Sequence, residues 1–263
     1  MLTRREFLIS AAAGGTALLL PTRVWGPGTL AAAAQTLSQA VPGGTLDPTP
    51  ISKFAQPLII PPAMPRTSKL PTAGRKAIDY YEIAVRQFRQ QILPAGLPAT
   101  TVWSYGSVNH PGSFNYPAFT IEAKWTAPVR VKWMNQLIDA NGNYLPHLLP
   151  IDQTLHWANP PGGPGGRDAE GLDPKRYMGP VPIVTHLHGR HSGQESDGFP
   201  EAWFLPAANN IPPGYATVGS YYDTFKTLAQ GLYGQPWTQA AQFFSTTTIR
   251  LLRLCGTTTT RSG

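Results

Sequence analysis

Two histidines stand two positions apart in a run that could bind a metal: Thr185-His186-Leu187-His188-Gly189. On a β-strand, residues i and i+2 point to the same face, so His186 and His188 would project together. Imidazole nitrogens suit copper, zinc and iron, and two such rings can hold one metal ion or two adjacent ones. By itself the pair is equally compatible with two hydrogen-bonded surface histidines. The spacing alone therefore leaves a metal site and a structural role both open.

The other histidines give weaker signals. His191 lies near the pair but has the wrong parity to share its face of a strand. His110, His147 and His156 are scattered singles, for which we expect surface or loop positions. The single cysteine, Cys255, excludes an internal disulfide framework and a multi-cysteine zinc site. Any metal site in this chain would thus depend on the His-x-His pair.

Short strands are the elements that must position these residues. Of 263 residues, 28 are Pro and 26 are Gly, which disfavours long helices. A period of two, typical of strands, recurs in five segments and no convincing helical period is present. The pattern predicts an all-β fold, a sandwich or barrel. The five predicted strands are Asp79–Phe88, Thr101–Tyr105, Ala118–Ala123, Val129–Trp133 and Val181–His186.

The first forty residues have the pattern of an export signal. Arg4 and Arg5, followed by Phe7-Leu8 and a short apolar stretch, are typical of the twin-arginine pathway. The apolar stretch of about 12 residues is too short for a spanning helix, which needs about 20. We expect 1–40 to engage the twin-arginine export machinery, with no stable membrane span. The protein would then be periplasmic, in the cell envelope or extracellular; an ordinary amphipathic N-terminus is the alternative.

The rest of the chain divides by composition and charge. Residues 41–75 are Pro-rich and predict an extended arm over the domain surface. The formal net charge is +7, but no run of basic residues exceeds two. A nucleic-acid partner is therefore not expected, since such proteins gather their basic residues on one face.

The segment after the histidines resembles a known family. His-Leu-His-Gly, a short spacer and then the run from Glu195 to Phe204, Glu-Ser-Asp-Gly-Phe-Pro-Glu-Ala-Trp-Phe, resemble the bacterial multicopper oxidases of the spore-coat laccase and bilirubin oxidase type. The resemblance extends over roughly residues 50 to 225. Further matching positions are Lys53-Phe54, Pro57, Ile60-Pro61, Tyr80-Tyr81-Glu82-Ile83, Val131-Lys132-Trp133-Met134-Asn135 and Leu148-Leu149-Pro150-Ile151-Asp152.

The resemblance implies a fold, a cofactor and roles for three residues. The fold would be a cupredoxin-like Greek-key β-sandwich or barrel, the N-terminal plastocyanin-like domain, over 76–242. Copper would be the cofactor, with His186 a ligand of type 2 copper and His188 a ligand of type 3 copper. Asp197 would assist proton delivery, because reduction of oxygen to water consumes protons; its alternative role is to form a turn before Gly198. The intact enzyme would oxidise phenols, pyrroles or metal ions as small-molecule reducing substrates and reduce dioxygen to water.

The chain departs from the family pattern near its C-terminus. It lacks the family's second histidine pair, in Leu-Trp-Tyr-His-Asp-His, and its six histidines are too few for a full ligand set. Residues 255–263 are instead Cys-Gly-Thr-Thr-Thr-Thr-Arg-Ser-Gly. One choice of codons for Leu-Trp-Tyr-His-Asp-His-Thr-Leu-Gly gives that run when read one nucleotide late; a natural low-complexity tail is the alternative. We therefore expect a frameshift near Gln242, a disordered tail over 243–263 and a truncated chain without oxidase activity of its own; resequencing the gene from about codon 235 tests this.

A second class of function stays open. The chain would then be a non-enzymatic exported cupredoxin-like protein, for copper storage or cell-envelope assembly. Retention of both His186 and His188 argues against a complete loss of copper binding. A copper titration distinguishes a copper-binding protein from one that has lost its ligands.

Overall fold

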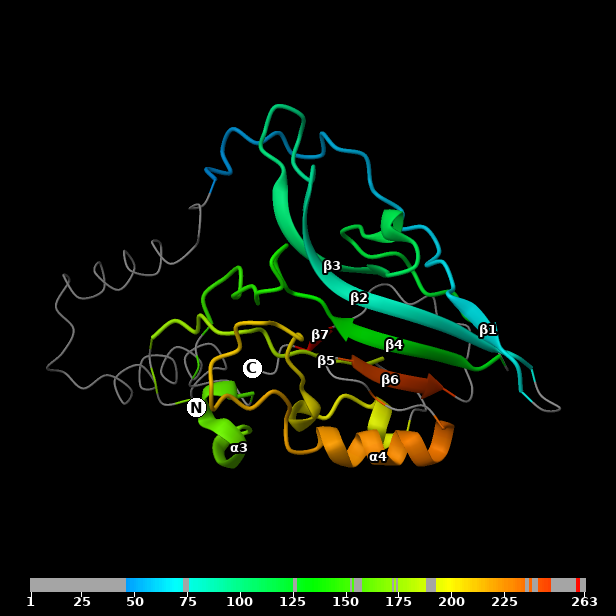
Figure 1. Ribbon diagram of the computed structural model, residues 1–263. Helices are drawn as coiled ribbons and strands as arrows, with labels where there is room; N and C mark the ends of the chain where they lie inside the picture. The colour runs from blue at the N-terminus through cyan, green and yellow to red at the C-terminus, as the bar shows by residue number, and fades with distance from the viewer. Residues whose placement is uncertain are drawn as a thin grey trace, which may run out of the picture. The chain divides into compact units, whose positions relative to one another are not determined.

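The computed structural model divides the chain into two units, Met1–Asp47 and Pro48–Gly263, and the fold described here is that of the second (Figure 1). Among the residues that the structure describes, no helix is long and apolar enough to cross a membrane. The structure describes residues 46–72, 76–124, 127–151, 153, 158–171, 173, 175–187, 193–234, 237, 241–246 and 259–260.

A long strand, β2 (Ile78–Gln90), organises the larger sheet. Its first residues alternate between buried and partly exposed positions, as expected for a strand with one face on a core. Along one edge it pairs antiparallel with β1 (Ser68–Leu70) and then with β3 (Thr100–Ser107). Along the other edge it pairs parallel with β4 (Val129–Asn135), which pairs antiparallel with β6 (Ala241–Thr246). The result is a five-stranded, mostly antiparallel sheet (Figure 1).

A smaller sheet completes the β structure. It consists of β5 (Val184–Thr185) and β7 (Thr259–Thr260), which pair antiparallel. Single bridges join Ile183 to Phe204 and Phe204 to Val218, which extends this layer through loop segments. Asn135, at the end of β4, donates from Nδ2 to the carbonyl oxygens of Val181 at 2.8 Å and Phe204 at 3.2 Å. That buried amide ties the larger sheet to the layer that carries the histidine motif.

One apolar core lies between these layers. Tyr81, Ile83 and Trp133 of the large sheet belong to the same buried cluster as Ile183 and Phe204 of the second layer. Ile83 and Phe204 are fully buried. A satellite cluster around the fully buried Trp203 packs behind Val184 and forms the floor under β5. The strand that leads to His186 is thus fixed by apolar packing on both sides.

One helix covers part of this core. It is α4 (Tyr222–Tyr233), which buries Tyr222, Phe225 and Ala229 and ends at Gly234 in the left-handed conformation, φ 65°. A glycine at that position is typical of helix C-termini because it has no Cβ to clash. The remaining helical segments are short: η1 (Pro111–Ser113), η3 (Pro160–Gly162), α3 (Gly163–Gly166), η4 (Gln194–Ser196) and η5 (Pro200–Ala202).

The fold is mostly β, which confirms the all-β prediction in part and corrects several of its elements. Strands are confirmed at β2, β3 and β4, whereas only Val184–Thr185 of the predicted strand at 181–186 is a strand. The predicted strand at 118–123 is absent, because Thr120 makes a single bridge with Ala63 and its neighbours do not pair. The helix α4 was missed. Strand β6 continues past residue 242, the predicted boundary between the domain and the C-terminal tail. The domain limits and the frameshift stay predictions.

Candidate metal centre

His186 follows directly after β5, and its side chain is packed inside the protein. It is 9% exposed, and Thr185 before it is fully buried. The Thr185 hydroxyl lies 3.4 Å from the hydroxyl of Tyr105 on β3, which links the two sheets just before the histidine. His186 therefore emerges from a rigid strand end. His188, the second predicted ligand, lies outside the described residues, as do His156 and His191.

The backbone of Gly198 lies against the imidazole of His186. A Cβ atom added at Gly198 would overlap Cγ and Nδ1 of that ring. Gly198 also has φ +76°, a left-handed conformation that favours glycine. Two separate constraints, close approach and backbone conformation, thus require glycine here. Residues 186 and 198 are brought together by the fold, and the Asp-Gly turn covers one side of the histidine ring.

Asp197, the predicted proton-delivery residue, sits at the end of the short helix η4 and is exposed. Its backbone N–H donates to the carbonyl oxygen of Gln194 at 3.3 Å, which closes the turn. Asp197 directly precedes Gly198, the residue whose backbone lies against the His186 ring. Asp197 is thus next in sequence to the residue that contacts His186, and its role in proton delivery stays a prediction.

Glu195 is a buried carboxylate to which no role was assigned from the sequence. It is 3% exposed. Its Oε1 accepts hydrogen bonds from the Tyr233 hydroxyl at 2.7 Å and from the Ser196 hydroxyl at 3.0 Å. The pKa of Tyr233 is raised above its ordinary value, first by burial and then by its bond to Glu195. Glu195 stands in the same motif two positions before Asp197, which was a visible signal, whereas Tyr233 required the helix that was missed.

Two of the single histidines, His110 and His147, make contacts with neighbouring side chains. His110 is exposed, and its Nδ1 lies 3.1 Å from the hydroxyl of Ser107. His147 lies in a loop, one of the two positions expected for it, but it is buried, with 7% exposed. Its ring packs between Trp103 and Tyr177, with centroid distances of 5.9 Å and 5.8 Å. Aromatic packing explains why this loop histidine is buried.

Among the described residues, His186 is the predicted ligand whose surroundings can be compared with the needs of a metal site. The buried His186 is a nitrogen donor of the kind copper prefers, and it is held by the Gly198 turn. Among residues that the structure describes, no group of three or more His, Cys, Asp or Glu side chains could hold a metal ion. His186 therefore fits a copper ligand but needs further donors from outside this part of the chain.

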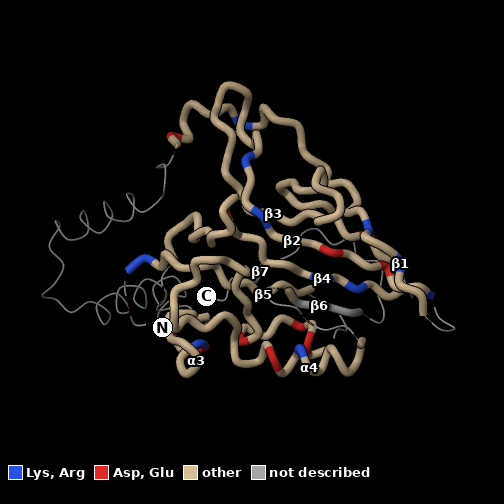
Figure 2. Tube along the Cα trace, viewed as in Figure 1, with Lys and Arg blue, Asp and Glu red and all other residues tan. Residues whose placement is uncertain are grey.

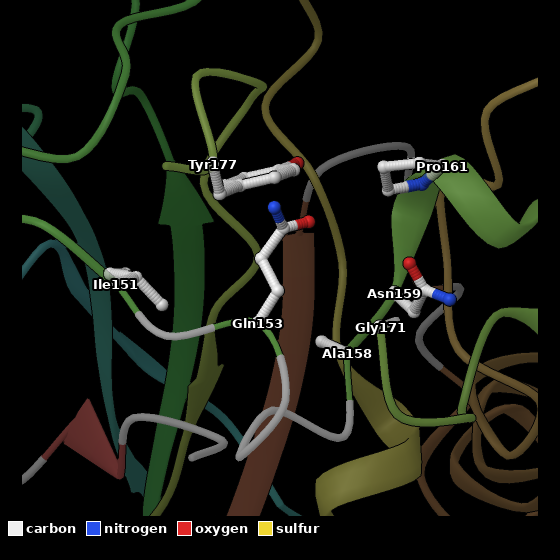
Figure 3. A pocket seen from close by; sticks show the side chains of 7 residues that line it. All are labelled: Ile151, Gln153, Ala158, Asn159, Pro161, Gly171 and Tyr177. Atoms are coloured by element: carbon white, nitrogen blue, oxygen red, sulfur yellow. The ribbon is translucent and has the colours of Figure 1, made fainter. Parts of the chain in front are cut away.

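A small cavity lies elsewhere, between residues 158–171, the Gly- and Pro-rich loop, and the segment around Tyr177. Its volume is about 10 Å³, enough for roughly one water molecule. Gln153 points towards the Tyr177 ring across it, and Asn159 lines the far side (Figure 3). This cavity is too small for an organic substrate. Lys and Arg positions are scattered along the described trace (Figure 2).

Known proteins similar to this chain are copper oxidases. The chain is 34% identical to a laccase of Haloferax volcanii over 213 residues, 80% of this chain and 29% of that protein. It is 34% identical to a laccase of Bacillus subtilis over 154 residues, 59% of this chain and 24% of that protein. A rice protein, multicopper oxidase LPR1 homolog 1, is 34% identical over 123 residues, 46% of this chain and 17% of that protein.

The chain matches part of the length of proteins in the multicopper oxidase and laccase family. It spans less than a third of the length of these curated relatives. No family model matches the sequence. Among solved structures, a multi-copper oxidase from Pediococcus acidilactici is similar with a TM-score of 0.32 and 16% identity, over 64% of this chain and 24% of that one.

Proposed function

We propose that this chain forms a cupredoxin-like Greek-key domain of a copper-dependent oxidase, in which His186 and His188 are copper ligands. The observation that carries the proposal is the contact between Gly198 and the buried imidazole of His186. Two separate parts of the laccase-like motif, the His-Leu-His-Gly run and the Ser-Asp-Gly turn, meet at that contact. The similarity to a laccase over 80% of this chain supports copper as the cofactor.

Copper, when bound, supplies the one-electron redox chemistry that protein side chains cannot perform. The chain's own residues would supply binding, orientation and protons. Because the Gly198 backbone lies beside Cγ and Nδ1 of His186, the ring would bind its metal through Nε2. Asp197 is exposed at the edge of the same turn, so its carboxylate can exchange protons with solvent and pass them towards the site.

The activity proposed for the whole protein is the oxidation of phenols, pyrroles or metal ions with reduction of oxygen to water. This chain alone is proposed to lack turnover, because two imidazoles leave copper coordination unfilled. Export by the twin-arginine pathway belongs to the same proposal. A reporter fused to residues 1–40 that stays in the cytoplasm would contradict the export step.

Copper binding is the first test. We expect Cu(II) titration of the full chain to show a site that is lost in His186→Ala and in His188→Ala and kept in the control His110→Ala. The control removes an exposed histidine that contacts Ser107. If the wild-type chain binds no Cu(II), or if all three variants bind it equally, the proposed ligands are wrong.

Oxygen uptake separates the two classes of function. With copper loaded and a phenolic dye supplied, an oxygen electrode is expected to record no turnover by this chain. Measured turnover would overturn the proposal that further ligands are needed. Copper binding in a whole protein that consumes no oxygen would instead favour the alternative, an exported cupredoxin-like copper-binding or cell-envelope protein.

A further inference from the structure

We infer that Glu195 and Tyr233 are positioning residues that press the Asp197–Gly198 turn onto His186. The inference rests on the proposed role of His186 as a copper ligand. It concerns the segment 193–199, which we name the turn segment. This segment is fastened to helix α4 at two points, and Gly198 lies between them.

The first attachment is the hydrogen bond between Tyr233 and Glu195. The Tyr233 hydroxyl donates to Glu195 Oε1 at 2.7 Å, from the last residue of α4. The Glu195 carboxylate also folds back over Gly193, where an added Cβ would overlap its oxygens. A carboxylate that is 3% exposed would be costly without such partners. Its burial here therefore depends on Tyr233 holding it.

Tyr233 is itself held by the large sheet. The guanidinium of Arg130, on β4, lies over the Tyr233 ring at 5.3 Å from its centroid. Arg130 is 7% exposed, so this cation–π contact is largely shielded from water. The contact fixes the ring, and the ring fixes the position of the hydroxyl that Glu195 accepts from.

The second attachment is aromatic and lies just after Gly198. Phe199 packs against Tyr221 at 5.9 Å and Phe225 at 5.1 Å between ring centroids. Phe225 is buried in the core on α4, whereas Phe199 is 36% exposed. The turn segment is thus anchored at Glu195 and at Phe199, on either side of the residue that covers the His186 ring.

Helix α4 therefore restrains the candidate ligand His186 through the turn segment. Loosening the Glu195 anchor would let the turn segment lift, and the His186 ring would lose the contact that restricts its rotation. Partners of this kind, which orient a ligand without touching the metal, commonly change metal affinity by about 10-fold to 100-fold when removed. Because Glu195 and Tyr233 act through Gly198, we expect an effect of roughly 10-fold, at the low end of that range.

The test compares two Tyr→Phe substitutions in the full chain. Tyr233→Phe removes the hydroxyl bound to Glu195 but keeps the ring beside Arg130. The matched control, Tyr80→Phe, removes a hydroxyl that donates to Glu82 Oε1 at 3.0 Å on the same sheet as Arg130. The readouts are the ring ¹H–¹⁵N signals of His186 in metal-free, histidine-labelled protein, and Cu(II) affinity in competition with a chelator.

We expect Tyr233→Phe to shift the His186 ring signals and to weaken Cu(II) binding roughly 10-fold, while Tyr80→Phe changes neither. Glu195→Ala should reproduce the effect even if Tyr233→Phe does not fold. Glu195→Gln should largely rescue it, since an amide oxygen can still accept from Tyr233. Unchanged His186 signals in both Tyr233→Phe and Glu195→Ala would overturn the inference. If the wild type binds no Cu(II) but Tyr233→Phe and Glu195→Ala still shift the His186 ring signals, the proposed function fails and the positioning role stands.

Discussion

At the scale of single residues, the contact between Gly198 and His186 is the feature that gives the candidate site its shape. The imidazole is buried, and the only residue that fits beside its Cγ–Nδ1 side at this backbone position is one without a Cβ. The positive φ of 76° adds a second reason for glycine. The Asp-Gly pair was recognised as turn chemistry in the sequence, but its contact with His186 became visible only in the fold.

A substitution at Gly198 tests that contact. Gly198→Ala should destabilise the protein through left-handed strain of about 1–2 kcal/mol and through overpacking of about 1–3 kcal/mol against His186. It should also weaken Cu(II) binding. The measurements are urea unfolding and the Cu(II) titration described above.

Gly214→Ala is the matched control, because Gly214 has φ +86° and an added Cβ there would meet nothing within 4 Å. It should carry the strain without the overpacking and should leave Cu(II) affinity unchanged. Equal losses in the two variants would show that backbone conformation alone, and not packing on His186, requires glycine at 198.

At the scale of elements, a single carboxylate joins the Gly- and Pro-rich loop to the layer under β5. Asp168 accepts from Trp203 Nε1 at 2.9 Å and from the backbone N–H of Ser220 at 3.0 Å. Trp203 is fully buried and supports Val184, the residue two positions before His186. The loop therefore contributes to the floor of the candidate site although it is remote in sequence.

Removal of this carboxylate should weaken the whole layer. Asp168→Ala leaves a buried indole N–H without its acceptor, a loss of about 1–3 kcal/mol in the free energy of unfolding. Urea denaturation measures it. Asp139→Ala is the control: Asp139 is exposed and also accepts two N–H groups, from Asn141 and Asn143, but only within its own turn. An equal or larger loss in Asp139→Ala would refute the special role of Asp168.

At the scale of the whole molecule, buried tyrosines make the fold sensitive to alkali. Burial raises the pKa of Tyr81 to about 12, and Tyr81 is 2% exposed. The pKa values of Tyr80, Tyr177, Tyr222 and Tyr233 are also raised, in each case chiefly by burial. These phenols stay protonated in the folded protein at a pH where the unfolded chain releases their protons.

The stabilisation contributed by these protonated tyrosines should therefore be complete below the ordinary tyrosine pKa near 10 and be lost as the pH rises towards about 12. The sign follows because the unfolded state binds fewer protons than the folded state in this window. Unfolding followed by urea at several pH values, with tyrosinate absorbance, measures the slope. Tyr81→Phe should reduce the slope, whereas Tyr116→Phe, at a residue 49% exposed, should not. A slope unaffected by Tyr81→Phe would contradict this assignment.

Local sequence pattern determined the strands and the candidate ligand. The period of two over 79–88 and 129–133 was sufficient to predict β2 and β4. Alternation that puts apolar residues on one face is a pattern that fits a strand with one buried face. It was insufficient at 118–123, where Ala63 of the arm provides only a single bridge. It also missed α4, since exposed Leu228 and Leu232 obscure the apolar stripe formed by Tyr222, Phe225 and Ala229.

Only the tertiary structure decided which distant residues meet. Spacing along a strand says that His186 and His188 share a face, but not what covers them. The contact of Gly198 with His186, and the bond from Tyr233 to Glu195 across 38 positions, depend on how α4 packs against the sheet. Such contacts leave no periodic signal, because each is made once, between side chains brought together by burial of the core.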